Sequence, residues 1–317
     1  MEIPKQSIVG NTQKIMDQLR KVIVGKDSVL LWTLAAILAK GHILLEDIPG
    51  VGKTTMAVAF SRVLGLSYNR VQFTPDVLPS DITGYSVLNQ TTGAMEYRAG
   101  AVLCNLFLAD ELNRATSRTQ SALLEAMEER QVTVDGTTYA LPEPFMVIAT
   151  QNPTGAAGTQ LLPDSQIDRF MVSQTMGYPD PKDEVMMLLQ RQGKDPMESL
   201  ETVVTAEELA QMQQTVAETF VSEEIAAYAV NLVDATRRSA DLMRGASPRA
   251  TLALVSMAKA IARMRGRDYV VPKDVQECFV TALSHRLQPS VEAESQGIDA
   301  VKALKIILGK IPTPRLR

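Results

Sequence analysis

The chain has 317 residues, of which 45% are hydrophobic and 21% charged, and its formal net charge is −4 at pH 7. This composition is that of a globular protein with enough apolar material for a sizeable core, and the length suggests about two domains. The mildly acidic balance carries no electrostatic footprint for nucleic acid. Residues 1–10 lack the pattern of a signal peptide, and the longest apolar stretch, 29–39, is too short to span a bilayer. We therefore expect a cytoplasmic protein without membrane insertion.

Cysteine and histidine usage predicts neither a disulfide framework nor a zinc site. Cys104 and Cys278 are the only cysteines and lie far apart in the sequence. We expect two buried thiols in a reducing compartment. His42 and His285 have no neighbours at metal-ligand spacing, so no structural zinc is predicted.

Strand-like and helix-like segments alternate over the first two thirds of the chain. Helical patterns occupy residues 54–64 and 117–129. This alternation predicts a mostly parallel sheet with helices on both faces. The short apolar runs that read as strands are 42–46, 70–74, 105–109, 144–150 and 171–176.

Two hairpins interrupt this alternation. The stronger signal is at residues 132–141, where Asp135 and Gly136 suit the positive φ angles of a tight turn. The weaker signal is at residues 85–97, which alternate on both sides of a turn at 90–93. Both segments are predicted to be β-hairpins.

The character of the chain changes at Pro179, where a cluster of helix-breaking residues begins. Thr205 and Glu208 form the pattern of a capping box before an amphipathic helix. We therefore predict two domains, with residues 1–180 as the α/β part and residues 181–317 as an all-α domain. Further helical patterns cover 222–238, 248–265, a segment opening at Pro272, and 298–308.

A glycine-rich segment follows the first apolar run directly and precedes a helix. Glycines let backbone N–H groups converge on a phosphate, and a helix N-terminus favours an anion. Lys53 can then reach the β- and γ-phosphates, and Thr54 can offer its hydroxyl to Mg²⁺. The strict phosphate-loop pattern has glycine where this chain has Asp47, but the flanking strand and helix favour a phosphate loop over an incidental glycine-rich turn. The candidate nucleotide-binding residues here are Pro49, Gly50, Val51, Gly52, Lys53, Thr54 and Thr55.

Polar side chains end two further apolar runs. Asp110 and Glu111 follow residues 106–109, and such a pair alone is common as a solvent-facing strand end. Beside a phosphate loop, Asp110 can hold the metal through water and Glu111 can polarise the attacking water. Asn152 ends the run in segment 150–153. Alone it reads as a turn-initiating Asn-Pro, but here we assign it to the water or the γ-phosphate.

Two arginines complete the candidate residues. Arg169 stands just before the fifth apolar run. Arg249 follows Ser247 and Pro248, a cap and first position that put it in the first turn of a helix. By residue type alone each is a surface arginine.

The ordered motifs resemble the AAA+ ATPases and, within them, closely resemble the MoxR family. The resemblance covers nearly the whole chain and is far more specific than a lone phosphate loop. The matching segments are, in order, 24–26, 45–55, 72–76, 84–85, 109–115, 120–136, 150–153, 163–170 and 247–249.

The resemblance implies an αβα P-loop AAA+ core with a five-stranded sheet, a C-terminal all-α lid, and ATP at their junction. Lys53 and Thr54 match Walker A, and Asp110 and Glu111 match Walker B, with Mg²⁺ held by Thr54 and Asp110. Asn152 matches sensor 1. Arg169 matches the arginine finger that acts on a neighbouring subunit, and Arg249 matches sensor 2.

Other positions gain an assignment from the resemblance alone. Val24 and Gly25 would border the adenine, and Lys26 stands where many relatives have glutamine. Arg114 matches an Asn-Arg pair after Walker B and could reach a subunit interface. Residues 85–97 would be the helix-2 insert, and residues 132–141 the hairpin before sensor 1.

The resemblance further implies a ring that acts as a chaperone-like remodeller. Members of the family usually form homo-hexamers. Maturation of a metalloenzyme or protein complex, with a partner carrying a von Willebrand factor A domain, is the usual role. Three alternatives stay open. A nucleic-acid motor or loader related to the MCM clade is disfavoured by the acidic balance. An ATP-gated scaffold is disfavoured by the complete catalytic set, and a metabolite kinase by the arginines and the helical tail.

Overall fold

A five-stranded sheet forms the centre of the protein, in a computed structural model that describes residues 5–152, 162–193 and 195–315. Its strands are β1 Ile43–Glu46, β2 Tyr68–Gln72, β5 Leu106–Asp110, β8 Met146–Gln151 and β9 Val172–Gln174. They pair in the order β2-β5-β8-β1-β9, and every pairing is parallel. The predicted parallel sheet is therefore confirmed, with β2 beginning two residues before the expected run at 70–74.

Parallel pairing brings the carboxyl ends of the strands to one edge of the sheet. Gln72 pairs with Asp110, and Glu46 pairs with Gln151. The segments that follow β1, β2, β5 and β8 therefore emerge side by side at this edge. The segments that precede β1 and β9 lie together at the opposite, amino edge, where the Met171 N–H donates to the carbonyl of His42 at 2.8 Å.

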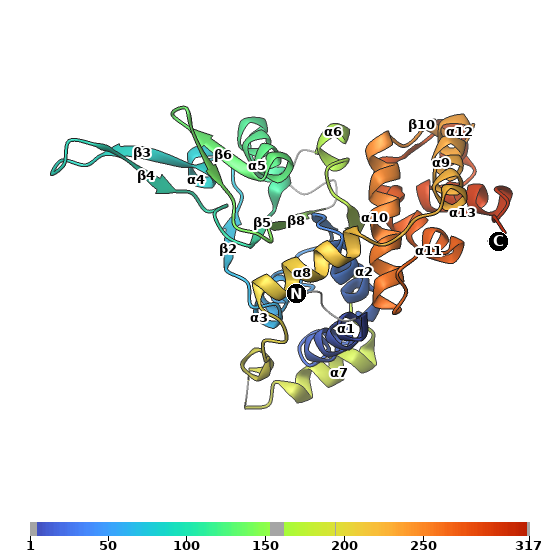
Figure 1. The fold of residues 1–317 in the computed structure, drawn as a ribbon, viewed down its shortest axis with the longest axis horizontal. Helices are drawn as coiled ribbons and strands as arrows, with labels where there is room; N and C mark the ends of the chain where they lie inside the picture. The colour runs from blue at the N-terminus through green and yellow to red at the C-terminus, as the bar shows by residue number, and fades with distance from the viewer. Residues whose placement is uncertain (1–4, 153–161, 194, 316–317) are drawn as a thin grey trace.

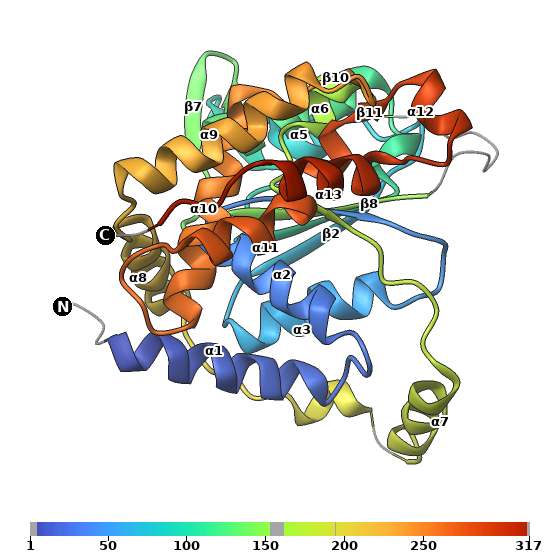
Figure 2. The same cartoon turned by 90° about the vertical axis from the view of Figure 1, so that its right-hand side faces the viewer.

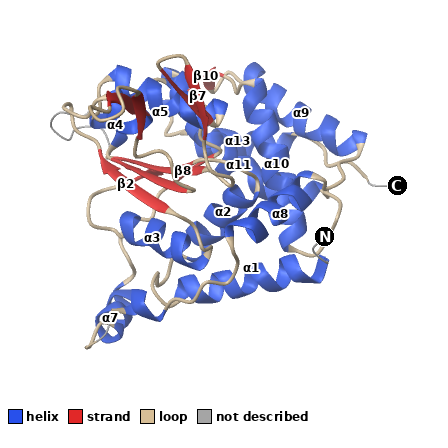
Figure 3. Cartoon of the chain, turned by 60° about the vertical axis from the view of Figure 1, so that its left-hand side comes forward, coloured by secondary structure: helices blue, strands red, loops and turns tan. Residues whose placement is uncertain are grey.

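Helices cover both faces of the sheet (Figure 3). One face carries α2 Asp27–Leu38 and α3 Lys53–Val63, with α1 Lys5–Arg20 outside them, and the other carries α4 Pro79–Thr83 and α5 Ser117–Glu129. Alternate strand residues point to opposite faces. Leu108 and Ile148 join the core on the α2 side, whereas Phe107 and Val147 join the core on the α5 side. Burial on both sides explains why β5 is an unbroken buried run.

Both predicted hairpins are present. β3 Gly84–Leu88 pairs antiparallel with β4 Met95–Ala99, and this hairpin extends away from the sheet at the left of Figure 1. β6 Gln131–Val134 pairs antiparallel with β7 Thr137–Ala140. The turn residues Asp135 and Gly136 have φ angles of 49° and 77°, as the sequence predicted.

Within the described residues, the C-terminal part is mainly helical and carries a short ladder and an isolated bridge between Phe220 and Tyr269 (Figure 2). The capping box of Thr205 and Glu208 is confirmed. The sequence missed the antiparallel pair β10 Leu242–Arg244 and β11 Gln288–Pro289, because three and two residues are too few to show a period. The helices are α7 Pro181–Gln190, α8 Ala206–Ala217, α9 Glu223–Arg238, α10 Pro248–Met264, α11 Pro272–Leu283, α12 Val291–Ser295 and α13 Ala300–Lys310, and shorter turns are α6 Asp164–Ile167, η1 Leu112–Arg114, η2 Pro196–Ser199 and η3 Ser284–Arg286.

The C-terminal helices share a core with the helices that cover the sheet. Leu254 and Met257 of α10 belong to the same buried cluster as Leu34 of α2. Gln213 of α8 donates its Nε2 to the carbonyl of Ile37 at 2.7 Å. The lid helices therefore pack firmly on one side of the α/β part, and the division of the chain at residue 181 stays a prediction.

Cys104 and Cys278 are both buried and unpaired, as expected from the sequence. None of the helices within the described ranges combines the length and the apolarity that a bilayer crossing requires.

Candidate active site

Residues 47–52 connect β1 to α3 and form the segment we call the phosphate loop. Gly50 and Gly52 have φ angles of +87° and +97°, a region that side chains rarely adopt. Gly52 caps α3 without a side-chain hydrogen bond, so the first amides of this helix stay available to an anion. The backbone therefore has the shape and polarity that a phosphate requires.

Lys53 opens α3 and is buried, with 7% of its surface exposed. Its Nζ donates to the backbone carbonyl of Asp47 at 2.6 Å, which is a neutral acceptor. Burial lowers the pKa of the Lys53 ammonium, and the nearby carboxylates of Asp47, Asp110 and Glu111 oppose that shift. A buried cation that is paired only with a neutral acceptor favours an anionic ligand. The residues present therefore fit a Mg²⁺-bound nucleoside triphosphate.

Asp47, which departs from the strict phosphate-loop pattern, has a structural task. Its Oδ1 accepts the N–H of Ile48 at 2.8 Å, and its Oδ2 accepts the N–H of Gly177 at 2.6 Å. It is not among the described residues with a positive φ angle. Glycine is therefore not required here, and the carboxylate instead fixes the start of the loop to the segment after β9.

The acid pair lies at the carboxyl edge, beside the phosphate loop. Asp110 ends β5, and its Oδ1 accepts the hydroxyl of Thr150 at 2.7 Å. The same hydroxyl oxygen accepts the N–H of Glu111 at 2.8 Å. Asp110 Oδ2 is bound by Arg70, with Nη2 at 2.7 Å and Nε at 3.2 Å. The sequence missed Thr150 and Arg70, whose contacts exist only because β2, β5 and β8 are neighbours.

Glu111 and Asn152 are in direct contact in the structure. Asn152 Nδ2 donates to Glu111 Oε1 at 3.1 Å, and Arg114 Nη1 donates to Glu111 Oε2 at 2.7 Å. The hydrogen bond from Arg114 is the main reason why the pKa of Glu111 lies below its ordinary value, and Asn152 adds to the effect. The carboxylate is therefore ionised and able to accept a hydrogen bond from water. Pro153, which belonged to the same predicted motif, lies outside the described residues.

Two adjoining cavities meet at the phosphate loop. The first, of ≈ 340 Å³, is lined by polar and charged groups, among them Lys53, Thr54, Asp110, Glu111 and Asn152. The second, of ≈ 470 Å³, is more apolar. Both are lined by Pro49, Gly50 and Gly52 of the loop and by Thr55 of α3. Together they provide one compartment suited to phosphates and another suited to a base.

The apolar compartment contains the expected Val24 and also residues that the sequence did not single out. Met176, Tyr178 and Met187 line it, the last from α7. Gly25 has a φ of +71°, and a Cβ there would stand 1.8 Å from Asp183 Oδ2. The positive φ angle therefore favours glycine at this position, and a Cβ would also force the side chain of Asp183 in α7 to shift.

Lys26 has a side-chain contact of its own. Its Nζ donates to the backbone carbonyl of Tyr178 at 2.8 Å, so it fixes the far wall of the apolar compartment.

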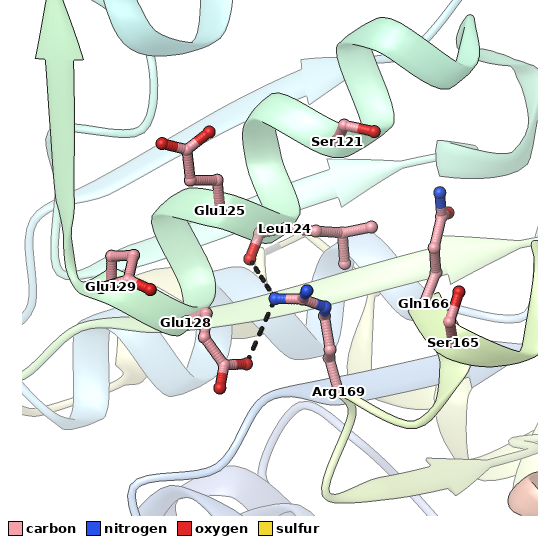
Figure 4. A pocket seen from close by; sticks show the side chains of 8 residues that line it. All are labelled: Ser121, Leu124, Glu125, Glu128, Glu129, Ser165, Gln166 and Arg169. Carbon is pink, nitrogen blue, oxygen red and sulfur yellow. Dashed lines mark hydrogen bonds and ion pairs between the residues drawn. The ribbon is translucent and has the colours of Figure 1, made fainter.

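Arg169 and Arg249 lie at the opposite edge of the sheet. Arg169 Nη1 donates to the carbonyl of Leu124 at 3.1 Å and to Glu128 Oε2 at 3.2 Å (Figure 4). Arg249 Nη2 donates to the other oxygen of Glu128 at 2.8 Å. Arg169 precedes β9 at the amino edge, whereas the phosphate loop follows the carboxyl end of β1. At about 3.3 Å per residue, the length of β1 separates Arg169 from the phosphate loop by roughly 15 Å.

The position of Arg249 is fixed by contacts between the lid and the core. Ser247, the cap of α10, donates to both carboxylate oxygens of Asp168, at 2.9 and 3.0 Å. Arg286 also donates to Asp168, at 3.1 Å, and to the carbonyl of Phe170 at 2.7 Å. Burial lowers the pKa of Arg286 to about 10, against the opposing effect of Asp168. Neither Arg169 nor Arg249 therefore lines the nucleotide cavities of its own chain.

The sequence matches models of two protein families. Residues 42–172 match the ATPase family associated with various cellular activities (AAA), and residues 234–304 match the AAA lid domain. The first matched segment includes β1, β2, β5 and β8 with the phosphate loop, and the second includes α10, α11 and α12 with parts of α9 and α13.

Relatives of similar length match the chain almost from end to end. It is 44% identical to the uncharacterized protein YeaC of Bacillus subtilis, over 95% of this chain and 94% of that protein. It is 38% identical to the chaperone MoxR1 of Mycobacterium tuberculosis, over 97% of this chain and 84% of the relative. It is 30% identical to the protein MoxR of Methylorubrum extorquens, over 94% and 93% of the two chains.

Solved structures agree with this relationship. A protein of Cytophaga hutchinsonii that is assigned as an ATPase superposes with a TM-score of 0.89 at 36% identity, over 98% of this chain and 97% of that one. A full-length MCM homolog from Methanopyrus kandleri superposes with a TM-score of 0.62 at 19% identity, over 91% of this chain and 63% of that one. The second likeness concerns the fold alone.

Proposed function

The chain belongs to the MoxR family of AAA+ ATPases, and we propose that it hydrolyses ATP between the subunits of a ring in order to remodel another protein. One observation carries this proposal. The phosphate loop, Lys53, the acid pair and Asn152 meet around one cavity, whereas Arg169 and Arg249 lie at the opposite edge of the same sheet. A complete site therefore requires a second copy of the chain.

The residues divide the work of hydrolysis among them. The base occupies the compartment near Val24 and Gly25, and Lys53 with the loop amides holds the β- and γ-phosphates. Mg²⁺, bound through Thr54 and Asp110, would supply charge neutralisation on these phosphates. Glu111 polarises the attacking water, and Asn152 keeps that water or the γ-phosphate in line. Positioning and charge neutralisation dominate such phosphoryl transfer.

The arginine pair acts on the next subunit. Glu128 presents Arg169 and Arg249 together on the face away from their own cavity, and we assign both of them to the γ-phosphate of the neighbouring chain. An arginine supplied in this way is typically worth ~10³–10⁵ in rate, so an isolated subunit should hydrolyse ATP slowly. Because Arg249 begins a lid helix, its contact also transmits the nucleotide state to the lid.

The target role rests on the family and on the surface of the molecule. The relative named chaperone MoxR1 supports a chaperone-like activity. The β3–β4 hairpin carries exposed apolar residues, including Tyr85, Leu88 and Met95, and is our candidate for contact with a client. The proposal further includes a homo-hexameric ring and a partner with a von Willebrand factor A domain. It also includes maturation of a metalloenzyme or complex as the role, and a cytoplasmic location. The fold-level likeness to an MCM homolog does not favour a nucleic-acid motor.

Two substitutions test the catalytic assignment. Glu111→Gln should keep ATP affinity, because the amide preserves the size of the side chain, and should nearly abolish turnover. Lys53→Ala should lose ATP binding as well, because it removes the buried cation. Calorimetry measures binding, and phosphate release measures turnover. Undiminished turnover in Glu111→Gln would remove Glu111 from its role, and full ATP affinity in Lys53→Ala would contradict the nucleotide site itself.

A further inference from the structure

Arg70 is a cation in the candidate active site to which no role has yet been given. It stands on β2, pairs in register with Leu108, and lines the same cavity as Lys53 and Glu111. Its side chain is 42% exposed, so it projects into the open part of this cavity. It binds one oxygen of Asp110 through two guanidinium nitrogens, at 2.7 and 3.2 Å.

The contact between Arg70 and Asp110 competes with the proposed role of Asp110 in holding the metal through water. The other carboxylate oxygen, Oδ1, already accepts the hydroxyl of Thr150. Arg70 thus holds Oδ2 of the same carboxylate that we assign to the hydration shell of the metal ion. A guanidinium and a divalent cation repel each other, so a metal ion bound beside Asp110 weakens the contact between Asp110 and Arg70.

The cavity offers Arg70 one new partner when Mg²⁺-ATP binds, which is the terminal phosphate. A guanidinium matches phosphate oxygens with its fork of donors, and such contacts are stronger than neutral hydrogen bonds. The side chain of Arg70 is partly exposed and lines the same cavity as Lys53 and Glu111, so it can turn toward a phosphate bound there. ADP has no γ-phosphate, so it provides no such partner for Arg70 in place of Asp110.

We propose that Arg70 is a γ-phosphate-binding residue supplied by the same chain, which exchanges Asp110 for the terminal phosphate when ATP binds. The inference rests on the proposed function and deepens it. It gives the site a means to distinguish ATP from ADP that acts within one subunit, separately from Arg169 and Arg249. If Arg70 only held β2 against β5, its removal would change the affinities for ATP and ADP alike. The effect on stability would also be small, because an exposed ion pair contributes little to stability.

Nucleotide affinities of the full-length chain test this inference. All variants carry Glu111→Gln so that ATP is not consumed, and calorimetry measures the affinities for ATP and for ADP in the presence of Mg²⁺. Arg70→Gln should weaken ATP binding about tenfold, the value of one charge-assisted contact, and leave ADP binding unchanged. Arg70→Lys should fall between, because it keeps the charge without the fork. Arg238→Gln, which removes an exposed arginine on α9, is the matched control and should change neither affinity.

The outcomes separate the two proposals. If the chain that carries only Glu111→Gln binds neither nucleotide, the proposed function fails and the inference fails with it. If that chain binds both nucleotides and Arg70→Gln or Arg70→Lys leaves the ratio of ATP to ADP affinity unchanged, the inference alone is overturned.

Discussion

At the scale of single residues, the hydroxyl of Thr150 organises the acid pair. It accepts the backbone N–H of Glu111 and donates to the carboxylate of Asp110, so one buried hydroxyl holds both the Asp110 side chain and the backbone of Glu111. The ionised state of Glu111 is set separately, mainly by Arg114. The geometry of the acids therefore depends on a side chain from the neighbouring strand β8, not only on their own strand.

Thr150→Val tests this dependence with a side chain of the same shape. The variant loses both hydrogen bonds and leaves the N–H of Glu111 without its acceptor, so we expect turnover to fall about tenfold or more. Thr150→Ser keeps the hydroxyl and should keep most of the turnover. Steady-state phosphate release measures both. Equal turnover in Thr150→Val and the parent chain would show that the hydroxyl does not position the acids.

The sequence identified the residues whose chemistry is local and missed those whose role is spatial. Lys53, Asp110, Glu111 and Asn152 each follow a strand signal, and the structure brings all four to one cavity. Arg70 lies in a half-exposed strand that reads as ordinary surface, and its contact with Asp110 exists only because β2 pairs with β5. The resemblance also singled out Arg169 and Arg249, but only the fold places these two away from the phosphate loop.

At the scale of elements, the strands that were predicted best are those buried on both faces. β5 and β8 are continuous buried runs, and their ends fall within one or two residues of the predicted ones. The β10–β11 ladder was missed because its stability comes from tertiary pairing and not from a local pattern. Local periodicity therefore predicted the elements, whereas their lateral order required the structure.

His42 connects three elements at the amino edge of the sheet. It precedes β1, its Nδ1 accepts the N–H of Val147 in β8 at 3.0 Å, and its Nε2 lies 3.2 Å from the carbonyl of Met127 in α5. Burial lowers the pKa of this imidazole from 6.5 to about 4, and Arg130 contributes to the shift. The neutral ring is thus a part of the packing between the sheet and α5.

This shift predicts a loss of stability in acid. Between pH 6.5 and 4 the unfolded chain binds a proton at His42 that the folded chain does not bind. The free energy of unfolding should therefore fall as pH decreases through this window, by at most about 1.4 kcal/mol per pH unit from this residue. His42→Asn keeps an acceptor for Val147 and removes the titration. Denaturant unfolding across this window should give a shallower pH dependence for the variant, and identical slopes would contradict the assignment.

At the scale of the whole molecule, the sheet separates the nucleotide cavity from the arginine pair that we assign to the next subunit. The nucleotide cavity lies at its carboxyl edge, and the arginine pair on Glu128 lies at its amino edge. Two different surfaces that complete one another make a head-to-tail contact, and repeated contacts of this kind close into a ring when the rotation allows. The lid helices share a core with the α/β part, so in the proposed ring packed structure connects the nucleotide cavity to the lid.

Mixing two inactive variants tests this shared site most directly. Arg169→Ala subunits keep a complete nucleotide cavity, and Glu111→Gln subunits keep the arginine pair, so each variant alone should turn over slowly. In mixed rings, a cavity of the first variant can face the arginines of the second, and turnover should rise above that of either variant. No rise at any mixing ratio, with mixed rings shown to form by mass spectrometry, would contradict a site divided between two chains.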